Sequence, residues 1–295
     1  MFKYGTQLSS LGRLPRPEAL AYGKTLGCQG LEVDLPVAAL RTGGTTKEAL
    51  LAEARALHAD FAAAGMDVIS LSPGLLLQDV QNPEIIQANC EVAQALGAST
   101  IRLFFAPHVR WGGPNSQLDA WHADFDGSHD SRYWLERNAR ELRQMVDMSA
   151  GFGLRYAFEL HHGYVINSAS AAMRIFDQFA PSEVGALMDP GNMVFEGNEG
   201  WRNSVQIMGE YLSYIHCKNG IWTRQDGKWV GSWDSLRDGI ARFPEIITAL
   251  QDEDWSGYLS IEDLRGGDLT VEEKVGGGIA YLQSLVASDE RAMPS

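Results

Sequence analysis

Polar residues that could transfer protons or bind a metal gather in four short segments of the second half of the chain. They stand in FELHH, which ends at His162, in LMDPGN, which contains Asp189, in YIHCKN, which contains His216, and in LSIED, which contains Glu262. Carboxylates and imidazoles are the side chains that exchange protons near neutral pH and that bind divalent metal ions. Each segment is built on a short apolar run, so the four polar sets are predicted to stand at the ends of strands.

The apolar runs themselves indicate the fold. Eight of them, rich in β-branched and aromatic residues, recur between longer stretches with helical spacing, such as TKEALLAEARALHADFAAAG and NPEIIQANCEVAQALG. Eight strand and helix pairs in about 250 residues or somewhat more are typical of a (β/α)₈ TIM barrel, which belongs to the α/β class. The runs begin at Lys3, Gly30, Asp67, Thr100, Arg155, Val184, Leu212 and Gly257.

No proline- or serine-rich linker divides the chain, so we expect a single barrel domain over residues 1–295. The alternative, an open doubly wound sheet, needs a glycine-rich phosphate loop after an early strand, and no segment has that spacing. Long loops are expected after the fourth and seventh strands. The second of these contains Asp226-Gly227 between alternating apolar and polar residues, which is a hairpin signal.

Composition narrows the class of partner. The formal net charge of -14 would repel a phosphate backbone, so a small molecule is a better partner than nucleic acid. The three cysteines have no CxxC spacing, which fits a reducing cytoplasm, and no apolar run approaches the roughly 18 residues of a membrane span. We therefore expect a cytoplasmic protein without a membrane partner, and a homodimer, because such barrels often pair through loops and outer helices.

Strand alternation decides which polar side chains can meet. In a TIM barrel the active site lies at the carboxyl ends of the strands, and successive side chains point to opposite faces. The mouth then receives Glu159, Asp189, His216 and Glu262, whereas Cys217 faces the helices as a small apolar residue. Each of the four, taken alone, could be an ordinary strand-end residue bonded to a loop backbone. Four of them with one parity argue against that interpretation.

Three carboxylates a few ångströms apart repel one another unless a cation lies between them or one takes up a proton. A divalent metal ion resolves this conflict. Oxygen-rich ligation with a single imidazole favours Mn²⁺ or Mg²⁺, with Co²⁺ and Zn²⁺ as alternatives.

At these residues the chain resembles the xylose-isomerase-like TIM barrel superfamily, in particular its sugar-phosphate isomerase/epimerase branch. The resemblance rests on FELHH, LMDPGNMV, YIHCKN, LSIED and RDGIARFPEIITAL. It implies that Glu159, Asp189, His216 and Glu262 bind one divalent metal ion. It also implies that Glu159 and Glu262 are the catalytic acid and base on opposite sides of the substrate.

Two positions depart from the pattern of the ketose epimerases in that branch. Asn192 stands where those enzymes usually have a histidine, three residues after the metal-binding aspartate. Trp222 stands where they often have an arginine, six residues after the metal-binding histidine. These departures indicate a different substrate.

A metal ion that chelates a carbonyl and a neighbouring hydroxyl stabilises the enolate formed when an α-proton is removed. We therefore expect a metal-dependent isomerase or epimerase that acts on a keto-sugar or related polyol through an enediolate. The alternative is a metal-dependent lyase or dehydratase, which would eliminate a group from a keto-sugar, an inosose or a 3-keto glycoside. The apurinic endonucleases of the superfamily need more histidines and a basic groove, which this chain does not offer. A non-catalytic sugar-binding barrel would have lost some of the four ligand residues, whereas all four are present here.

Further residues are candidates for the substrate shell. His161 shares the inward face with Glu159, either as a second acid or base or as a hydrogen-bond partner that orients a ligand. Lys218 could hold a substrate oxygen or neutralise nearby carboxylates. His162 is predicted to face outward or into the loop and is a weaker substrate contact. Arg265 and Trp111 are the remaining predicted substrate contacts.

Arg102 also has inward parity, as do Glu32 and Asp34, and an ion pair between the arginine and these carboxylates would be architectural. The tryptophans in or beside the long loops could stack on a sugar ring or pack the loops onto the barrel. They are Trp111, Trp222, Trp229 and Trp233.

Overall fold

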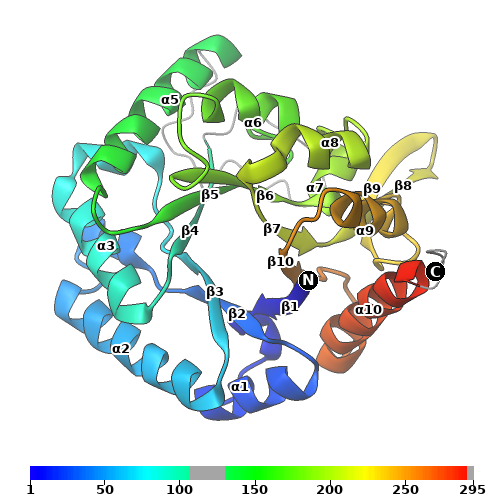
Figure 1. Cartoon of the computed structure of the whole chain (residues 1–295), viewed down its shortest axis with the longest axis horizontal. Helices are drawn as coiled ribbons and strands as arrows, with labels where there is room; N and C mark the ends of the chain where they lie inside the picture. The colour runs from blue at the N-terminus through cyan, green and yellow to red at the C-terminus, as the bar shows by residue number, and fades with distance from the viewer. Residues whose placement is uncertain (106–129, 291–295) are drawn as a thin grey trace.

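The computed structural model describes residues 1–105 and 130–290. Within these residues, eight parallel strands close into a barrel in the order β1-β10-β7-β6-β5-β4-β3-β2 (Figure 1). Every apolar run predicted to be a strand forms one, so the TIM-barrel prediction is confirmed. The strands are β1 (Phe2–Gln7), β2 (Gly30–Asp34), β3 (Asp67–Ser72), β4 (Thr100–Leu103), β5 (Arg155–Glu159), β6 (Val184–Met188), β7 (Leu212–Cys217) and β10 (Gly257–Ile261).

Helices surround the barrel, as Figure 1 shows. Their ends follow local sequence signals: the Thr46 side chain accepts a hydrogen bond from the Ala49 amide at the start of α2, and α3 begins with Pro83. The helices are α1 (Arg16–Thr25), α2 (Lys47–Ala64), α3 (Pro83–Leu96), α5 (Ser131–Met148), α6 (Ala169–Phe176), α7 (Pro190–Phe195), α8 (Trp201–Met208), α9 (Phe243–Asp252) and α10 (Gly277–Glu290). None of the helices in the described residues is long and apolar enough to cross a membrane.

The apolar core has two parts. The large part lies between the strands and the helices, and it includes Cys217, as predicted from alternation. A small separate cluster contains Ile69, Ala157, Leu187 and Tyr214. The last three stand two residues before Glu159, Asp189 and His216, so alternation places these polar side chains in the next layer toward the carboxyl ends of the strands.

The long segment after the seventh barrel strand is a hairpin, as its sequence predicts. It pairs β8 (Asn219–Gln225) with β9 (Lys228–Asp234) in antiparallel register. The turn residues Asp226 and Gly227 have φ angles of 48° and 79°, the left-handed conformations that a two-residue hairpin turn requires. The segment after β4, which contains Trp111, falls mainly outside the described residues.

Candidate active site

Four ionisable side chains meet at the carboxyl ends of neighbouring strands. Glu159 ends β5, Asp189 follows β6, His216 lies in β7, and Glu262 follows β10. All four are buried, and each offers a ligand atom within 4.8 Å of the others. The structure thus brings together the four residues that alternation selects, and their metal-binding role stays a prediction.

His216 is the centre of this cluster. Its Nδ1 atom lies 3.3 Å from Glu262 Oε2, 3.6 Å from Asp189 Oδ2 and 3.8 Å from Glu159 Oε1. Nδ1 has no hydrogen-bond partner among the described residues, although the ring is fully buried. A buried nitrogen aimed at three carboxylate groups has the arrangement that a divalent cation would complete, so the residues fit a metal ion.

The net charge of the cluster also favours a bound divalent cation. Four buried carboxylates, those of the cluster and Glu32, surround the imidazole, and two side-chain cations, Arg102 and Lys218, lie among them. With a neutral His216 the net charge is minus two, which one divalent ion would balance. Burial would lower the pKa of His216, but the Glu32 and Glu262 carboxylates raise it well above its ordinary value. The cluster therefore attracts positive charge strongly.

Arg102 does not form the predicted ion pair with Glu32 or Asp34. Its Nε donates to Glu159 Oε2 at 2.9 Å, its Nη2 donates to the same oxygen, and Asp34 is exposed. The reason is strand order: β4 pairs with β5 in a register that sets Arg102 opposite Ala157, two residues before Glu159. Asn192 donates to the other oxygen, Glu159 Oε1, at 3.0 Å.

Lys218 lies against the carboxylates of the cluster. Its Nζ is 2.5 Å from Glu262 Oε2 and 2.7 Å from Asp189 Oδ2, and it lies 4.9 Å from the centre of the Trp233 ring. The contact with Asp189 is an ion pair. Here the lysine neutralises carboxylates, one of the two predicted roles, and its contact with substrate stays a prediction.

The two consecutive histidines lie just beyond β5. His161 Nδ1 is 2.8 Å from the His162 carbonyl oxygen, so Nδ1 carries the proton and Nε2 is the acceptor in the neutral ring. Burial lowers the pKa of His161 despite the nearby Glu159. The imidazole is therefore neutral at neutral pH and could act there as a base.

His162 packs into the loops beyond the strand, which is one of the two orientations predicted for it. It is only 2% exposed and contacts the rings of Phe195 and Trp233. Burial, with smaller contributions from the neighbouring His161 and from Lys218, lowers its pKa to about 3. Alternation could not place this residue because β5 ends at Glu159 and a turn follows.

The other predicted substrate contacts are less directly connected to the cluster. Arg265 donates to both carboxylate oxygens of Asp263. Trp222 donates its indole N–H to the Val194 carbonyl oxygen at 3.3 Å, and Trp229 is 66% exposed. Trp222 thus packs the hairpin onto α7, and substrate contacts of Arg265 and Trp111 stay predictions.

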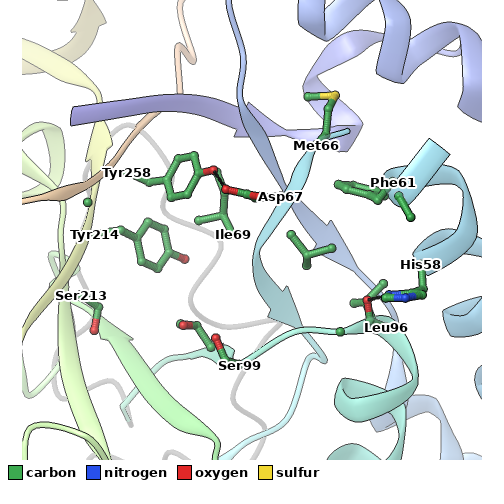
Figure 2. A pocket seen from close by; sticks show the side chains of 15 residues that line it. His58, Phe61, Met66, Asp67, Ile69, Leu96, Ser99, Ser213, Tyr214 and Tyr258 are labelled. Carbon is green, nitrogen blue, oxygen red and sulfur yellow. Dashed lines mark hydrogen bonds between the residues drawn. The ribbon is translucent and has the colours of Figure 1, made fainter. Parts of the chain in front are cut away.

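A cavity of about 450 Å³ lies at the opposite, amino-terminal end of the strands. Figure 2 shows the side chains that line it, among them Tyr214 and Tyr258; the Tyr258 hydroxyl donates to Asp67 Oδ2 at 2.5 Å. In TIM barrels the chemistry takes place at the carboxyl ends of the strands, so the histidine and carboxylate cluster, and not this cavity, is the candidate active site.

A closed parallel barrel with ionisable groups at the carboxyl ends of its strands defines the class of TIM-barrel proteins with a site at the barrel mouth. Residues 20–285 match the family model described as "Xylose isomerase-like TIM barrel", and the chain belongs to that family.

Comparisons with individual proteins give distant matches. Inosose dehydratase 2 of Bacillus cereus is 24% identical over 141 residues, which cover 43% of this chain and 46% of that protein. The chain thus matches less than half the length of this curated relative.

Two solved structures resemble the chain over most of its length. The 3-keto-D-glucoside 4-epimerase YcjR of E. coli has a TM-score of 0.68 and 17% identity, covering 96% of this chain and 100% of that chain. A xylose isomerase-like TIM barrel protein of Mycobacterium smegmatis, in complex with magnesium, has a TM-score of 0.65 and 16% identity, covering 94% of this chain and 90% of that chain. At these identities the likeness shows the fold alone.

Proposed function

We propose that this chain is a divalent-metal-dependent isomerase or epimerase that acts on a keto-sugar or related polyol through an enediolate. The observation that carries the proposal is the arrangement of His216, whose unbonded Nδ1 faces Glu159, Asp189 and Glu262. The similar proteins include an epimerase and an inosose dehydratase, which supports carbohydrate chemistry of this kind.

The four clustered residues would hold the ion, with Mn²⁺ or Mg²⁺ as the expected metal and Co²⁺ or Zn²⁺ as alternatives. When bound, the ion would supply Lewis-acid stabilisation of the negative charge on an enolate oxygen.

Proton transfer to and from carbon would belong to Glu159 and Glu262, one on each side of the substrate. The two carboxylates differ in their partners. Glu159 is held by Arg102 and Asn192, whereas Glu262 accepts from Gln7 at 2.7 Å and from Lys218, whose long side chain can turn toward a substrate oxygen. Glu262 is therefore the carboxylate that Lys218 can release for proton transfer.

The substrate shell is proposed from the remaining groups at the mouth. His161, a neutral imidazole beside Glu159, would move a proton between substrate oxygens. Lys218 would hold an oxygen of the substrate, and His162, Arg265 and Trp111 would complete the shell.

Metal binding tests the core of this proposal. We expect isothermal titration of the metal-free protein with Mn²⁺ to give one site per chain. Glu159→Gln and His216→Ala should each weaken binding at least about 100-fold, because each removes a ligand. His58→Ala is the matched control, since this histidine is exposed at the other end of the barrel. Absence of metal binding by the unmutated protein would overturn the proposal.

A metal-dependent lyase is the second candidate. The inosose dehydratase match favours it, as do Asn192, where ketose epimerases usually have histidine, and Trp222, where they often have arginine. Incubation with keto-sugars in D₂O separates the two candidates. Deuterium incorporation without loss of a substituent supports the isomerase or epimerase, and release of water or an aglycone supports the lyase.

A further inference from the structure

The second nitrogen of His216 faces away from the three clustered carboxylates. Its Nε2 atom lies 3.1 Å from Glu32 Oε1 and 3.2 Å from Glu32 Oε2. Glu32, on β2, is 2% exposed and is not one of the four grouped ligand residues. The imidazole is therefore held between two distinct carboxylate environments, one on each nitrogen.

Glu32 is itself fixed by donors from the barrel interior. Ser260 donates its hydroxyl to Oε1 at 2.5 Å, and Tyr214 donates its hydroxyl to Oε2 at 3.0 Å. Ser70 lies 3.4 Å from Oε2 and 3.1 Å from the Tyr214 hydroxyl. These donors come from β10, β7 and β3 and are all buried, so the carboxylate has little freedom to turn away from the imidazole.

The direction of the hydrogen bond follows from this arrangement. An ionised carboxylate only accepts hydrogen bonds, so Nε2 must carry the proton that joins His216 to Glu32. The lone pair of the neutral ring is then on Nδ1, the atom that faces Glu159, Asp189 and Glu262. A carboxylate behind a ligating histidine fixes the tautomer and orientation of the ring and increases its basicity as a ligand.

We propose that Glu32 is a positioning residue for metal binding, which acts by holding His216 in the Nε2–H tautomer with Nδ1 aimed into the cluster. This inference rests on the proposed metal-dependent function and adds a residue to it. The sequence predicts only an architectural role for Glu32, in an ion pair that the structure does not contain.

Glu32→Gln tests the proposal because it keeps the size of the side chain and removes its charge. We expect the variant to bind Mn²⁺ about 10- to 100-fold more weakly than the unmutated protein in isothermal titration. Tyr214→Phe, which removes one hydroxyl from Glu32 but keeps the ring, should cause a smaller loss. Asp34→Asn is the matched control on the same strand, where the carboxylate is exposed, and should bind like the unmutated protein.

A spectroscopic measurement separates positioning from general loss of structure. In ¹⁵N-histidine-labelled protein loaded with Mg²⁺, the unmutated chain should show a protonated Nε2 and an unprotonated Nδ1 for His216. Because Tyr214→Phe perturbs the fold less than a buried charge removal, it keeps the test open if Glu32→Gln does not fold. Its Mn²⁺ affinity should still fall severalfold. Its unfolding temperature without metal should fall only by the amount expected for the loss of one hydroxyl group.

The outcomes are distinguishable. If the unmutated protein binds no metal, the proposed function fails and this inference fails with it. If the unmutated protein binds metal and Glu32→Gln binds equally well, only the role of Glu32 is overturned. If Nδ1 of His216 is the protonated nitrogen in the metal-loaded protein, both the role of Glu32 and the role of His216 as a ligand through Nδ1 are overturned.

Discussion

At the scale of single residues, Lys218 and the expected metal ion compete for the same atoms. The ammonium contacts Asp189 Oδ2 and Glu262 Oε2, which are also the oxygens nearest to His216 Nδ1. A divalent cation bound at His216 would face the positive charge of Lys218 at close range. The lysine must therefore weaken metal binding or turn away when the metal is present.

We predict that Lys218→Met tightens Mn²⁺ binding at least about tenfold, since it removes a cation from a buried site. The same variant should lose about 100-fold in turnover, because the substrate oxygen loses its partner. Isothermal titration measures the first effect, with Lys3→Met as control, since Lys3 forms an exposed ion pair with Asp67. Weaker Mn²⁺ binding by Lys218→Met would instead show that the lysine orients the carboxylates for the metal.

The residues of the cluster could be predicted from sequence, but most of their partners could not. Glu159, His216 and Glu262 follow from alternation, which depends only on positions within one strand. The partner of Arg102 depends on which strand lies beside β4, and the role of Glu32 depends on side chains that cross the barrel. Inward parity marks Tyr214 and Ser260 as barrel-interior residues, without indicating that both bind Glu32.

At the scale of elements, the start of α7 shapes the site. Asp189 caps this helix: its Oδ1 accepts a hydrogen bond from the backbone N–H of Asn192 at 2.9 Å, so one carboxylate oxygen is fixed. Gly191 then packs directly on Lys218: a Cβ atom at Gly191 would lie 2.6 Å from Lys218 Cγ and 2.9 Å from its backbone carbonyl carbon. Glycine is needed here because the helix and the strand end approach so closely.

We predict that Gly191→Ala destabilises the protein by about 1–3 kcal/mol, the usual result of adding a methyl group to a filled interior. The clash should also displace Lys218 and lower turnover. Urea denaturation measures the first effect. Gly266→Ala is the control, because a Cβ at that position meets no heavy atom within 4 Å and should leave stability unchanged. Equal stability of the two variants would contradict the close packing.

The elements that sequence predicts best are those with local signals. The eight barrel strands follow from apolar runs, and the hairpin follows from Asp226-Gly227, whose backbone needs left-handed conformations. The end of β5 has no such signal. Alternation past Glu159 therefore leaves two orientations open for His162, and the structure shows the one in the loop, where His162 lies in a turn and packs against Trp233 of the hairpin.

At the scale of the whole molecule, the barrel hides all three thiols. Cys28, Cys90 and Cys217 are buried and unpaired by disulfides. Burial raises the pKa of each, to about 12 for Cys28 and well above the ordinary value for Cys217. A raised pKa keeps the group protonated and unreactive below that value.

We predict that the folded protein reacts with less than one equivalent of 5,5′-dithiobis(2-nitrobenzoic acid) at about pH 8 within an hour, because the thiols are buried and protonated. In guanidinium chloride all three thiols should react, which serves as the internal control. Rapid reaction of one thiol in the folded state would mean that the barrel opens locally on that timescale.

The expected homodimer stays a prediction that sedimentation equilibrium would test.

The order of strands around the barrel places all four grouped ligand residues in one half of the molecule. The grouped ligand residues come from β5, β6, β7 and β10, which are adjacent in the closed sheet, whereas β1, β2 and β4 supply the supporting Gln7, Glu32 and Arg102. Because the barrel closes between β1 and β10, the site spans the seam where the first strand meets the last. A fragment that carries only the ligand half would therefore keep the ligands but lose Gln7, Glu32 and Arg102.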